Sequence, residues 1–398
     1  MKILIQKFGG TSVSTKERRL KVIEKVKKAI LDGFTPVVVV SAMGRKGEPY
    51  ATDTLLSLVD NNFKQNNLLP LDLLLSCGEI ISSVVMSNEF FNANIDAIPL
   101  TGGQSGIITN DNFNDAEVSR VDTKHILSLL EKGKVPVVTG FQGITEDGYF
   151  TTLGRGASDF TAAVLGVALK AKEIQIYTDV DGIMTADPRI VGEACLIDKI
   201  SYNEVFQFAD QGAKVIHPRA VEMAMRGNIP LVIRNTMSDS HGTLINSIGD
   251  ENGSSIMTGI THMSDRIQIN VLSEDNKNNN DLDEVLDILA ENNISLDLIN
   301  IFPNQKTFTI DKNCFNKFDE IMKKMELKYS HIDDCSKLSI IGSRMVGVPG
   351  VMAKILKALK GEKIEVLQTA DSHTTIWCLV HTVNIKRALN VIHKTFMS

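Results

Sequence analysis

Lys7, Gly9 and Gly10 are the residues whose types and spacing best suit chemistry, and that chemistry is the binding of a phosphate group. They stand in the segment KFGGTS, between an apolar run from Met1 to Gln6 and a helical pattern from about Lys16 to Asp32. At such a strand-to-helix turn the backbone N–H groups attract anions. Glycine lets a phosphate approach the main chain, and Lys7 adds positive charge. A tight turn that needs glycine for its backbone angles is the alternative.

Four further polar clusters follow predicted strands or begin predicted helices, where an open α/β sheet binds its ligands. Taken singly, Asp53 and Ser158 suit helix caps, and Asp187-Pro188 suits a turn. Arg189 and Arg219 suit solvated or paired side chains. The clusters are Ser41-Ala42-Met43-Gly44 with Thr52-Asp53, Gly154-Arg155-Gly156-Ala157-Ser158-Asp159, Thr178-Asp179 with Asp187-Pro188-Arg189, and Gly212-Ala213-Lys214 with His217-Pro218-Arg219.

Glu79 lies on a predicted helix that is otherwise apolar on the same side, with Leu74, Ile81 and Val84 nearby. A buried carboxylate is costly unless it is paired. We therefore expect Glu79 either at the solvent edge of this face or beside a cationic partner.

Taken together, these clusters suit phosphoryl transfer, which depends on positioning, on positive charge and on Mg²⁺ between the phosphates. Lys7, Arg189 and Lys214 are the candidate cations. A carboxylate acceptor is already ionised at neutral pH and needs no general base. No GxxxxGK[ST] segment occurs, and Asp159 occupies the place of the third glycine of a dinucleotide fingerprint, so neither nucleotide motif is met.

The composition excludes several classes of protein. The net charge of −6 argues against nucleic acid as the main partner. No stretch approaches the length of a membrane span, and Met1-Lys2 leads into a strand rather than into a signal peptide. Five scattered cysteines without a CxxC pair predict reduced thiols, and eight histidines without HExxH spacing indicate no dedicated metal site. We expect a cytoplasmic protein with no membrane partner.

The first 245 residues alternate between short apolar strands and helical patterns, which predicts a mostly parallel sheet with helices on both faces. The first helix is expected to place Leu20, Ile23, Val26 and Ile30 on one face and to end at Gly33. The strands expected after the first are Pro36 to Ala42, Ile95 to Leu100, Val135 to Thr139, Ile174 to Thr178 and Pro230 to Arg234.

The rest of the chain predicts a linker and then a repeated module. Ser238 to Gly259 is polar and contains glycine, which is typical of a linker. Beyond it, an apolar helical pattern and a β-rich segment occur twice, which indicates two small α+β modules of roughly 70 residues each. Modules of this size are weakly stable alone, so we expect them to pair. The helical patterns are Leu282, Val285, Leu286 and Leu289, then Met352, Ile355, Leu356 and Leu359; the β-rich segments are Ile294 to Ile299 and Ile364 to Thr369; Asn276 to Asn280 is expected to be a solvated loop.

Five motifs in this order, KFGGTS, SCGE, LGRGASD, TDVDGIMTADPR and GAKVIHPRA, resemble the aspartokinase family, and the two modules resemble its tandem ACT domains. The resemblance covers essentially the whole chain. It is closest to the monofunctional aspartokinases of Bacillus-type bacteria that respond to diaminopimelate, through the segments GVPG and QTADSHTTIW. It implies an α/β amino-acid-kinase fold in residues 1–245, a linker in 246–261, and two α+β ACT domains in 262–334 and 335–398.

The resemblance also implies the activity and the residues that carry it. The expected reaction transfers the γ-phosphoryl group of Mg-ATP to the β-carboxylate of L-aspartate, giving 4-phospho-L-aspartate, the first step toward diaminopimelate, lysine, threonine and methionine. Arg155 would clamp the α-carboxylate bidentately, which lysine cannot do, and Glu79 would face the α-ammonium. Ala157 departs from the glycine usual in the family. The implied sets are Lys7, Asp159 and Lys214 for catalysis, Ser41, Thr52, Glu79, Arg155 and Ser158 for aspartate, and Lys7, Phe8, Gly9, Gly10, Ser41, Thr178, Asp179, Arg189 and Lys214 for ATP.

The ACT resemblance implies an amino-acid effector and a homodimer or a higher homo-oligomer joined through the ACT domains. Diaminopimelate is the first choice of effector and lysine the second, while a plain surface histidine is the alternative for His373. Two rival interpretations of the chain are another amino-acid kinase, acting on glutamate or a carbamate, and an inactive amino-acid sensor. The expected effector positions are Asn293, Ile294, Ser295, Asp297, Val348, Gly350, Val351, Asp371, His373 and Thr374.

Overall fold

The computed structural model describes residues 1–154, 156–211, 215–250, 255–272, 280–302, 305–325, 327–345 and 347–397. Of the expected loop from Asn276 to Asn280, residues 276–279 lie outside these ranges, and Asn280 begins a helix rather than ending a loop. Two of the expected site residues, Arg155 and Lys214, also lie outside these ranges. The chain divides into two compact units. The first unit comprises Met1–Ile183, Leu196–Ala209 and Lys214–Asn252, and the second comprises Met184–Cys195, Asp210–Ala213 and Gly253–Ser398.

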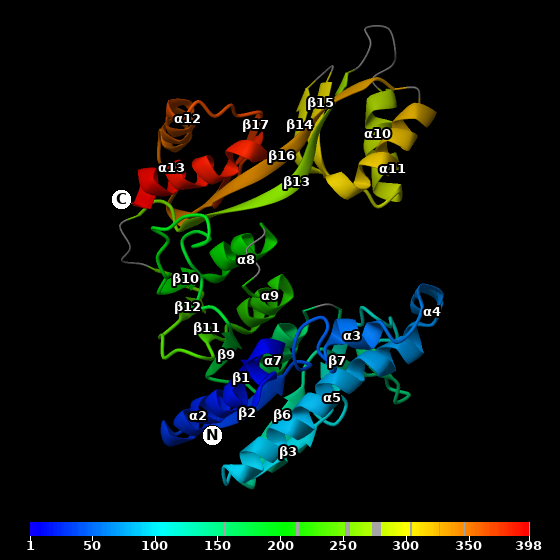
Figure 1. Cartoon of the computed structure of the whole chain (residues 1–398), viewed down its shortest axis with the longest axis vertical. Helices are drawn as coiled ribbons and strands as arrows, with labels where there is room; N and C mark the ends of the chain where they lie inside the picture. Colours follow the sequence, from blue (N-terminus) through cyan, green and yellow to red (C-terminus); the bar gives the residue numbers. More distant parts are fainter. Residues whose placement is uncertain are drawn as a thin grey trace. The chain divides into compact units, whose positions relative to one another are not determined.

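An eight-stranded sheet forms the centre of the first unit, in the order β10-β12-β11-β9-β1-β2-β6-β3 (Figure 1). All neighbouring strands pair in parallel except β11 and β12, which confirms the prediction of a mostly parallel sheet. Strands that are buried on both faces appear in the sequence as continuous runs of β-branched residues, as in the Val37 to Val40 segment of β2. The strands are β1 (Ile3–Phe8), β2 (Thr35–Val40), β3 (Ala97–Leu100), β6 (Val135–Thr139), β9 (Glu173–Thr178), β10 (Lys199–Ser201), β11 (Leu231–Asn235) and β12 (Thr243–Asn246).

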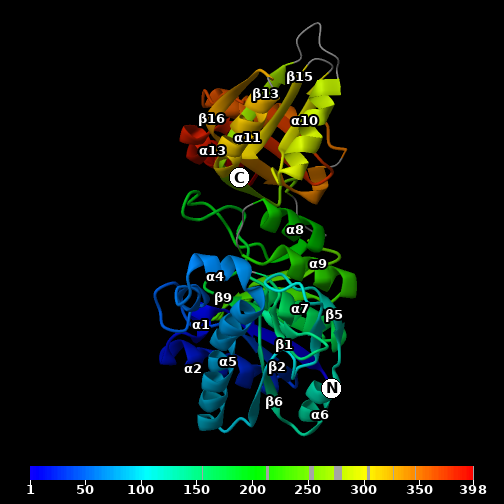
Figure 2. The ribbon, with the colours of Figure 1, turned by 90° about the vertical axis from the view of Figure 1, so that its right-hand side faces the viewer.

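Helices cover both faces of this sheet (Figures 1 and 2). On one face α2 (Lys16–Leu31) and α5 (Leu68–Asn92) share a core with Phe8 of β1 and Tyr177 of β9. On the other face lie α7 (Ser158–Ala168) and α9 (Pro218–Gly227); Gly166 of α7 packs closely on Ile174 of β9. Alternate residues of each strand therefore face different helices.

The predicted apolar face of α2 is wrong at two of its four positions. Ile23 and Val26 are buried, but Leu20 and Ile30 are 48% and 41% exposed. The helix buries Val22 and Ala29 instead, because it turns a slightly different stripe toward the sheet. Its end is as predicted: Gly33 has a positive φ of 81°, which suits glycine after a helix terminus.

A smaller sheet and several short helices complete the first unit. Part of the polar stretch expected as a linker belongs to the large sheet, since Thr243–Asn246 is β12. The backbone can pair there because the ladder uses main-chain groups whatever the side chains. The small sheet has the order β5-β4-β7-β8, with β4 (Ile107–Thr109), β5 (Val118–Val121), β7 (Gln142–Ile144) and β8 (Phe150–Thr152); the remaining helices are α1 (Gly10–Val13), α3 (Thr52–Leu56), α4 (Asn61–Asn66), α6 (Lys124–Glu131) and α8 (Tyr202–Asp210).

Among the described residues, α5 alone is long and apolar enough to cross a membrane by length and composition. Its side chains Leu71 and Leu75 belong to one core cluster of the unit, and Met86 and Phe90 belong to another. The core helix of a soluble protein meets the same criteria, so the length of α5 is weak support for a span.

The second unit is built on a six-stranded antiparallel sheet in the order β14-β15-β13-β16-β18-β17. Two helices accompany each half, and the repeat predicted from the sequence is confirmed: each half contains the succession helix, strand, strand, helix. The elements are β13 (Gly259–Leu272), α10 (Asn280–Glu291), β14 (Asp297–Phe302), β15 (Gln305–Asp311), η1 (Lys312–Cys314), α11 (Phe315–Lys324), β16 (Tyr329–Ile341), η2 (Ser343–Met345), α12 (Val351–Gly361), β17 (Gln368–Asp371), β18 (Thr375–His381), η3 (Thr382–Asn384) and α13 (Ile385–Met397).

The two long central strands, β13 and β16, each serve both modules. Residues 266–272 of β13 pair with β15 in the first module, whereas residues 259–263 pair with the part of β16 that also pairs with β18 in the second. The segment 259–261, which falls inside the expected linker, is thus a strand. The first module has its own core around Phe308 and Phe318, and the second has one around Leu338 and Ile355.

Two short segments from the earlier part of the chain belong to the second unit. Ala186 and Val191 are buried in the core of the second module. Thr185 lies 2.9 Å from His393, between Oγ1 and Nε2. Gln211 is 5% exposed, and its Oε1 accepts hydrogen bonds from Trp377 Nε1 at 3.1 Å and Ser339 Oγ at 3.2 Å. These segments are thus fixed by tertiary contacts with distant residues.

Candidate active site

The glycine turn lies at the carboxyl end of β1, in the middle of the large sheet. Gly9 has a φ of −69°, and Gly10 is the first residue of the short helix α1. Neither needs a left-handed backbone, so the turn-angle explanation of these glycines is not supported. A Cβ on Gly10 would lie 2.5 Å from the carbonyl oxygen of Ala42, whereas a Cβ on Gly9 would meet no atom closer than Lys7 Nζ at 3.6 Å. Gly10 is required for close packing, whereas the nearest atom to Gly9 at this point is the Lys7 ammonium nitrogen.

Lys7 and Asp159 form an ion pair at this edge of the sheet. Lys7 Nζ lies 2.7 Å from Asp159 Oδ1, and both side chains are largely buried. Oδ1 accepts no aligned hydrogen bond despite the short distance, so the contact is an ion pair only. The backbone N–H of His217 donates to Oδ2 at 3.3 Å. Asp159 stands in the first turn of α7, where a carboxylate is stabilised by the helix dipole.

Glu79 reaches the same edge from α5. The backbone N–H of Ala42, just past the end of β2, donates to Glu79 Oε1 at 3.0 Å. The side chain is 2% exposed, and Oε2 has no hydrogen-bond partner. Burial raises the pKa of this carboxyl to about 8. The expectation of a solvent-edge position is wrong, and no basic side chain of the described residues pairs with Glu79.

Ser41 and Ser158 lie on the loops that surround this edge. The N–H of Ser41 donates to the carbonyl oxygen of Phe8 at 3.2 Å, which joins the ends of β1 and β2. Ser158 begins α7 and packs against Gly140, just past β6, so closely that a Cβ on Gly140 would lie 2.7 Å from Ser158 Cβ. Ala157, before α7, is fully buried with a φ of −73°, so alanine fits at this position without backbone strain.

Thr178 and Asp179 end β9, beside β1 in the sheet. Thr178 is half-buried, and its carbonyl oxygen accepts a hydrogen bond from Thr236. Asp179 is exposed and pairs with Arg45 at 2.6 Å between Oδ2 and Nη2. Arg45 lies on the loop after β2, so this pair connects the two strand ends that flank β1. Arg45 is not among the predicted site residues; its only signal in the sequence is the basic pair Arg45-Lys46 directly after Gly44.

Arg219 is a second residue whose position the sequence did not indicate. Its Nη1 donates to the carbonyl oxygen of Leu153 at 2.9 Å, and its guanidinium lies 4.4 Å from the centre of the Phe160 ring. It is neither freely solvated nor at a helix C-terminus. It holds the main chain at Leu153, just before Gly154.

The three remaining described site residues have contacts of their own. Phe8 is fully buried and stacks on Tyr177 at 4.7 Å, so only its backbone can face a ligand. Thr52 begins α3, which packs on α5. Arg189 belongs to the second unit, where its guanidinium bonds to Asp187 and lowers the pKa of that carboxyl. The structure thus brings together Lys7, Gly9, Gly10, Ser41, Glu79, Ser158, Asp159 and Thr178.

The expected effector residues divide between the modules of the second unit. In the first module Asn293 and Ser295 are exposed, Ile294 is in the core, and Asp297 pairs with Lys337. Lys337 belongs to the part of β16 that pairs with β18, so this ion pair joins the modules. In the second module Val351 is buried at the start of α12, and Val348, Gly350, Asp371 and His373 are exposed, with Thr374 half-buried.

The chain is similar to known proteins along its whole length. Residues 2–235 match the amino acid kinase family, and residues 330–394 match an ACT domain. Aspartokinase 1 of Bacillus subtilis (strain 168) is 43% identical over 401 residues, covering 100% of this chain and 99% of that protein. The fold is similar to that of E. coli aspartokinase III in two crystal structures. The structure with aspartate and ADP, in the R-state, has a TM-score of 0.79, and the structure with lysine and aspartate, in the T-state, has a TM-score of 0.78. Each is 24% identical in sequence to this chain, and each match covers 100% of both chains.

Proposed function

The chain belongs to the amino acid kinase family, and within it to the aspartokinases. Its reaction transfers the γ-phosphoryl group of ATP to the β-carboxylate of L-aspartate, and we propose a role in this transfer for each residue of the site. The product is 4-phospho-L-aspartate, the first intermediate toward diaminopimelate, lysine, threonine and methionine. The observation that carries this assignment is the convergence of Lys7, Gly9, Glu79 and Asp159 on one edge of the parallel sheet.

Lys7 is the proposed electrostatic catalyst. Its ammonium lies beside the backbone of Gly9, where a γ-phosphoryl group with three charged oxygens would be neutralised. Asp159 holds the ammonium in place at 2.7 Å. The attacking β-carboxylate is ionised at neutral pH, so the reaction needs positioning and charge stabilisation rather than proton removal. This agrees with a site whose central contact is an ion pair.

Glu79 is proposed to receive the α-ammonium of aspartate. Its Oε2 is buried and without a partner, and a cation arriving there would restore the ionised form of the carboxyl. We assign the α-carboxylate to Arg155, with Ser41, Thr52 and Ser158 as further aspartate contacts. An acceptor with both α-groups bound in this way presents its β-carboxylate to the phosphate.

ATP is proposed to bind along the ends of β1 and β9. The turn of Phe8, Gly9 and Gly10 would supply backbone amides to the phosphates, and Thr178 and Asp179 would contact the nucleoside. Arg189 and Lys214 are the further cations proposed for the phosphate chain. The position of the Lys7 ammonium, 3.6 Å from where a Cβ on Gly9 would lie, supports the phosphate position.

Mg²⁺ is proposed to accompany ATP. No group of three or more His, Cys, Asp or Glu that could hold a metal occurs among the described residues, and Mg²⁺ bound with a nucleotide takes few protein ligands. Asp159 is the carboxylate at this edge proposed to face the ion, with Lys7 and the N–H of His217 as its present neighbours. The ion would neutralise charge between the phosphates.

Regulation is proposed to act through the ACT modules. E. coli aspartokinase III binds lysine, and we propose diaminopimelate as the effector here, with lysine as the second candidate. Asp297 and the segments from Val348 to Val351 and Asp371 to Thr374 are the proposed contacts. We further propose that the protein forms a homodimer or a higher homo-oligomer through these modules. We also propose a cytoplasmic location, with which five unpaired cysteines agree.

A hydroxamate assay tests the activity. The protein is incubated with Mg-ATP and either aspartate or glutamate, and the acyl phosphate is trapped with hydroxylamine. We expect hydroxamate with aspartate only. Product with glutamate only would indicate the other kinase, and no product with either would indicate the amino-acid sensor.

Lys7→Ala tests the role of Lys7 within this activity. We expect kcat to fall by roughly 10³-fold, as for the loss of a group that stabilises transition-state charge. Arg226→Gln is a matched control, because Arg226 lies on α9 in an exposed pair with Glu222. Full activity in Lys7→Ala would remove the phosphate assignment.

A further inference from the structure

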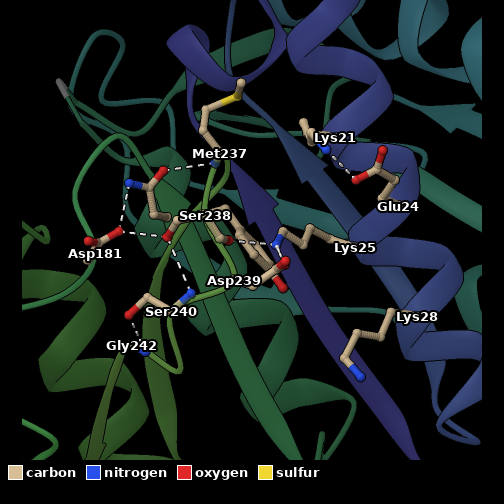
Figure 3. Close-up of polar contacts among 12 residues, drawn as sticks. Lys21, Glu24, Lys25, Lys28, Asp181, Met237, Ser238, Asp239, Ser240 and Gly242 are labelled. Carbon is tan, nitrogen blue, oxygen red and sulfur yellow. Dashed lines mark hydrogen bonds and ion pairs between the residues drawn. The ribbon is translucent and has the colours of Figure 1, made fainter.

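A cavity of about 310 Å³ opens on the face of the large sheet that carries α2, behind the glycine turn. Strands β1, β9 and β11 form its floor, and α2 and the loop after β11 form its walls (Figure 3). This volume is at the lower end of the range for small-molecule sites. None of the residues assigned above to aspartate, ATP or effector lines it. The lining includes Gln6, Lys25, Lys28, Gln175, Tyr177 and Arg234.

The floor of the cavity contains an acceptor without a donor. Gln6 is 1% exposed, and its Nε2 donates to Gln175 Oε1 at 3.0 Å, while its Oε1 has no partner. The orientation of these amides is fixed by their neighbours: Gln175 Oε1 also accepts from the Tyr177 hydroxyl, and Gln175 Nε2 donates to Glu173. Turning the Gln6 amide over would bring two carbonyl oxygens together, so the unpaired atom is an acceptor.

Beside this acceptor lies a cation without a counter-ion. Arg234 lies in β11, opposite Tyr177 of β9 in the sheet register. Its guanidinium interacts with the Tyr177 hydroxyl, while its buried Nε donates no hydrogen bond. No carboxylate of the described residues pairs with it. A buried guanidinium nitrogen without a partner is costly, and a ligand oxygen would remove that cost.

The charges at the rim are already balanced in pairs. Lys25 donates to Asp239 at 2.8 Å and to the carbonyl oxygen of Ser238 at 2.7 Å, as Figure 3 shows, and Lys28 pairs with Asp32 at 3.4 Å. Arg234 is the remaining charge, so the cavity has a net positive charge of one. It therefore favours an anion.

We propose that this cavity binds a small organic acid that also carries a hydroxyl or ammonium donor. Its oxyanion bonds to the Arg234 guanidinium, which presents parallel N–H groups to a carboxylate, and its donor bonds to Gln6 Oε1. The site is separate from the proposed aspartate site. Its occupant would contact Tyr177, which stacks on Phe8 and whose carbonyl oxygen accepts the N–H of Gly9, so Tyr177 links the cavity to the glycine turn.

Calorimetric titration with D-glycerate tests the proposal, on the full chain with aspartate and ADP present so that the catalytic edge is filled. We expect saturable binding to the unmodified protein. Arg234→Gln weakens it at least tenfold, whereas Arg226→Gln leaves it unchanged. Inorganic phosphate is the second probe: tighter binding of glycerate identifies an organic acid, and binding of phosphate alone overturns that ligand class.

Gln6→Leu isolates the second contact. This variant lowers the affinity for D-glycerate to that for propionate, which lacks the hydroxyl, and leaves propionate binding unchanged. Thermal melts of both variants establish that they are folded. The proposal is overturned if glycerate shows no saturable binding at high millimolar concentration, if Arg234→Gln binds it normally while folded, or if a crystal soaked in glycerate holds only water between Gln6 and Arg234.

Discussion

The two units treat a buried charge in opposite ways. In the first unit Glu79 is 2% exposed, and no cation of the described residues meets its carboxyl. In the second unit the side chain of Lys337 is 3% exposed, and it already has Asp297 as its partner. One unit keeps a buried carboxyl that stays protonated until a cationic ligand pairs with it, and the other uses a buried charge to join two modules.

Whether the buried group has a partner within the protein distinguishes a ligand-binding site from a structural ion pair. A buried ionisable group without a partner destabilises the empty protein and increases the gain when a complementary ligand binds. A buried group with a partner contributes fixed geometry and offers a ligand less. The comparison predicts that the two charges respond differently to pH and to substitution.

The largest expected effect is the pH dependence of stability that Glu79 causes. Burial raises its folded-state pKa from 4.5 to about 8. Between these values the unfolded chain has released the proton and the folded chain has kept it, so the free energy of unfolding falls as pH rises, by about 1.4 kcal/mol per pH unit at most. Glu79→Gln has no such proton. In urea titrations from pH 5 to pH 9 we expect the stability of the variant relative to the parent to increase through this window.

Two outcomes would weaken the comparison. A constant difference between Glu79→Gln and the parent would mean that Glu79 is ionised in the empty protein. A KM for aspartate that is unchanged in the variant would mean that the carboxylate does not meet the α-ammonium; we expect KM to rise about 100-fold, or near 3 kcal/mol.

The second prediction concerns the Lys337–Asp297 pair. Asp297→Asn leaves the buried ammonium without a carboxylate, and we expect a loss of about 3 kcal/mol in the stability of the second unit. Lys337→Met leaves only the Asp297 carboxylate, which is 40% exposed and can be solvated, so its cost should be below about 1 kcal/mol. Differential scanning calorimetry of the two variants measures this asymmetry. Equal costs would show that Lys337 is solvated in the folded protein.

The third prediction concerns the hydrogen bond between Trp377 and Gln211. Gln211 lies three positions before Lys214, and Trp377→Phe removes one of the donors to its Oε1. We expect a loss of about 1 kcal/mol in stability and a several-fold increase in the effector concentration for half inhibition. Tyr329→Phe is the matched control, since it removes a similar bond, to Asp319, inside the first module. The same shift in both variants would mean that Gln211 has no special part in regulation.

The smallest expected effect is the release of one proton when aspartate binds. If Glu79 is protonated in the empty site and ionised beside aspartate, binding at pH 7 releases about one proton for each aspartate. Calorimetry in buffers of different ionisation enthalpy measures the number. No proton exchange in the parent, or the same release in Glu79→Gln, would contradict this account.

The sequence predicted the parallel sheet well because a strand buried on both faces appears as a short run of apolar, β-branched residues. Val135 to Thr139 was predicted with the observed limits, and β2 and β9 were shifted by a residue or two. The strand β12 was missed because Thr243–Asn246 is only four residues long and stands in an otherwise polar stretch. The exposed positions of Leu20 and Ile30 were missed because periodicity gives a spacing but not the tilt of a helix on its sheet.

The candidate site was predictable where motifs mark strand ends and not where distant segments meet. Lys7, Gly9 and Asp159 stand in such motifs, and the structure places them together. The missing partner of Glu79 depends on which residues surround α5 in space. The pocket at Gln6 and Arg234 joins residues 228 positions apart in the chain, and neither belongs to a recognisable motif.

The shared strands β13 and β16 set a rule for exchanging modules between related proteins. A chimaera that carries only residues 335–397 of the second module would lack residues 259–263, which complete the ladder beside β16. The donor piece must therefore be discontinuous, taken from both ends of the regulatory half. For the same reason neither module can be gained or deleted as one continuous segment, since any single boundary would divide a strand that the other module also uses.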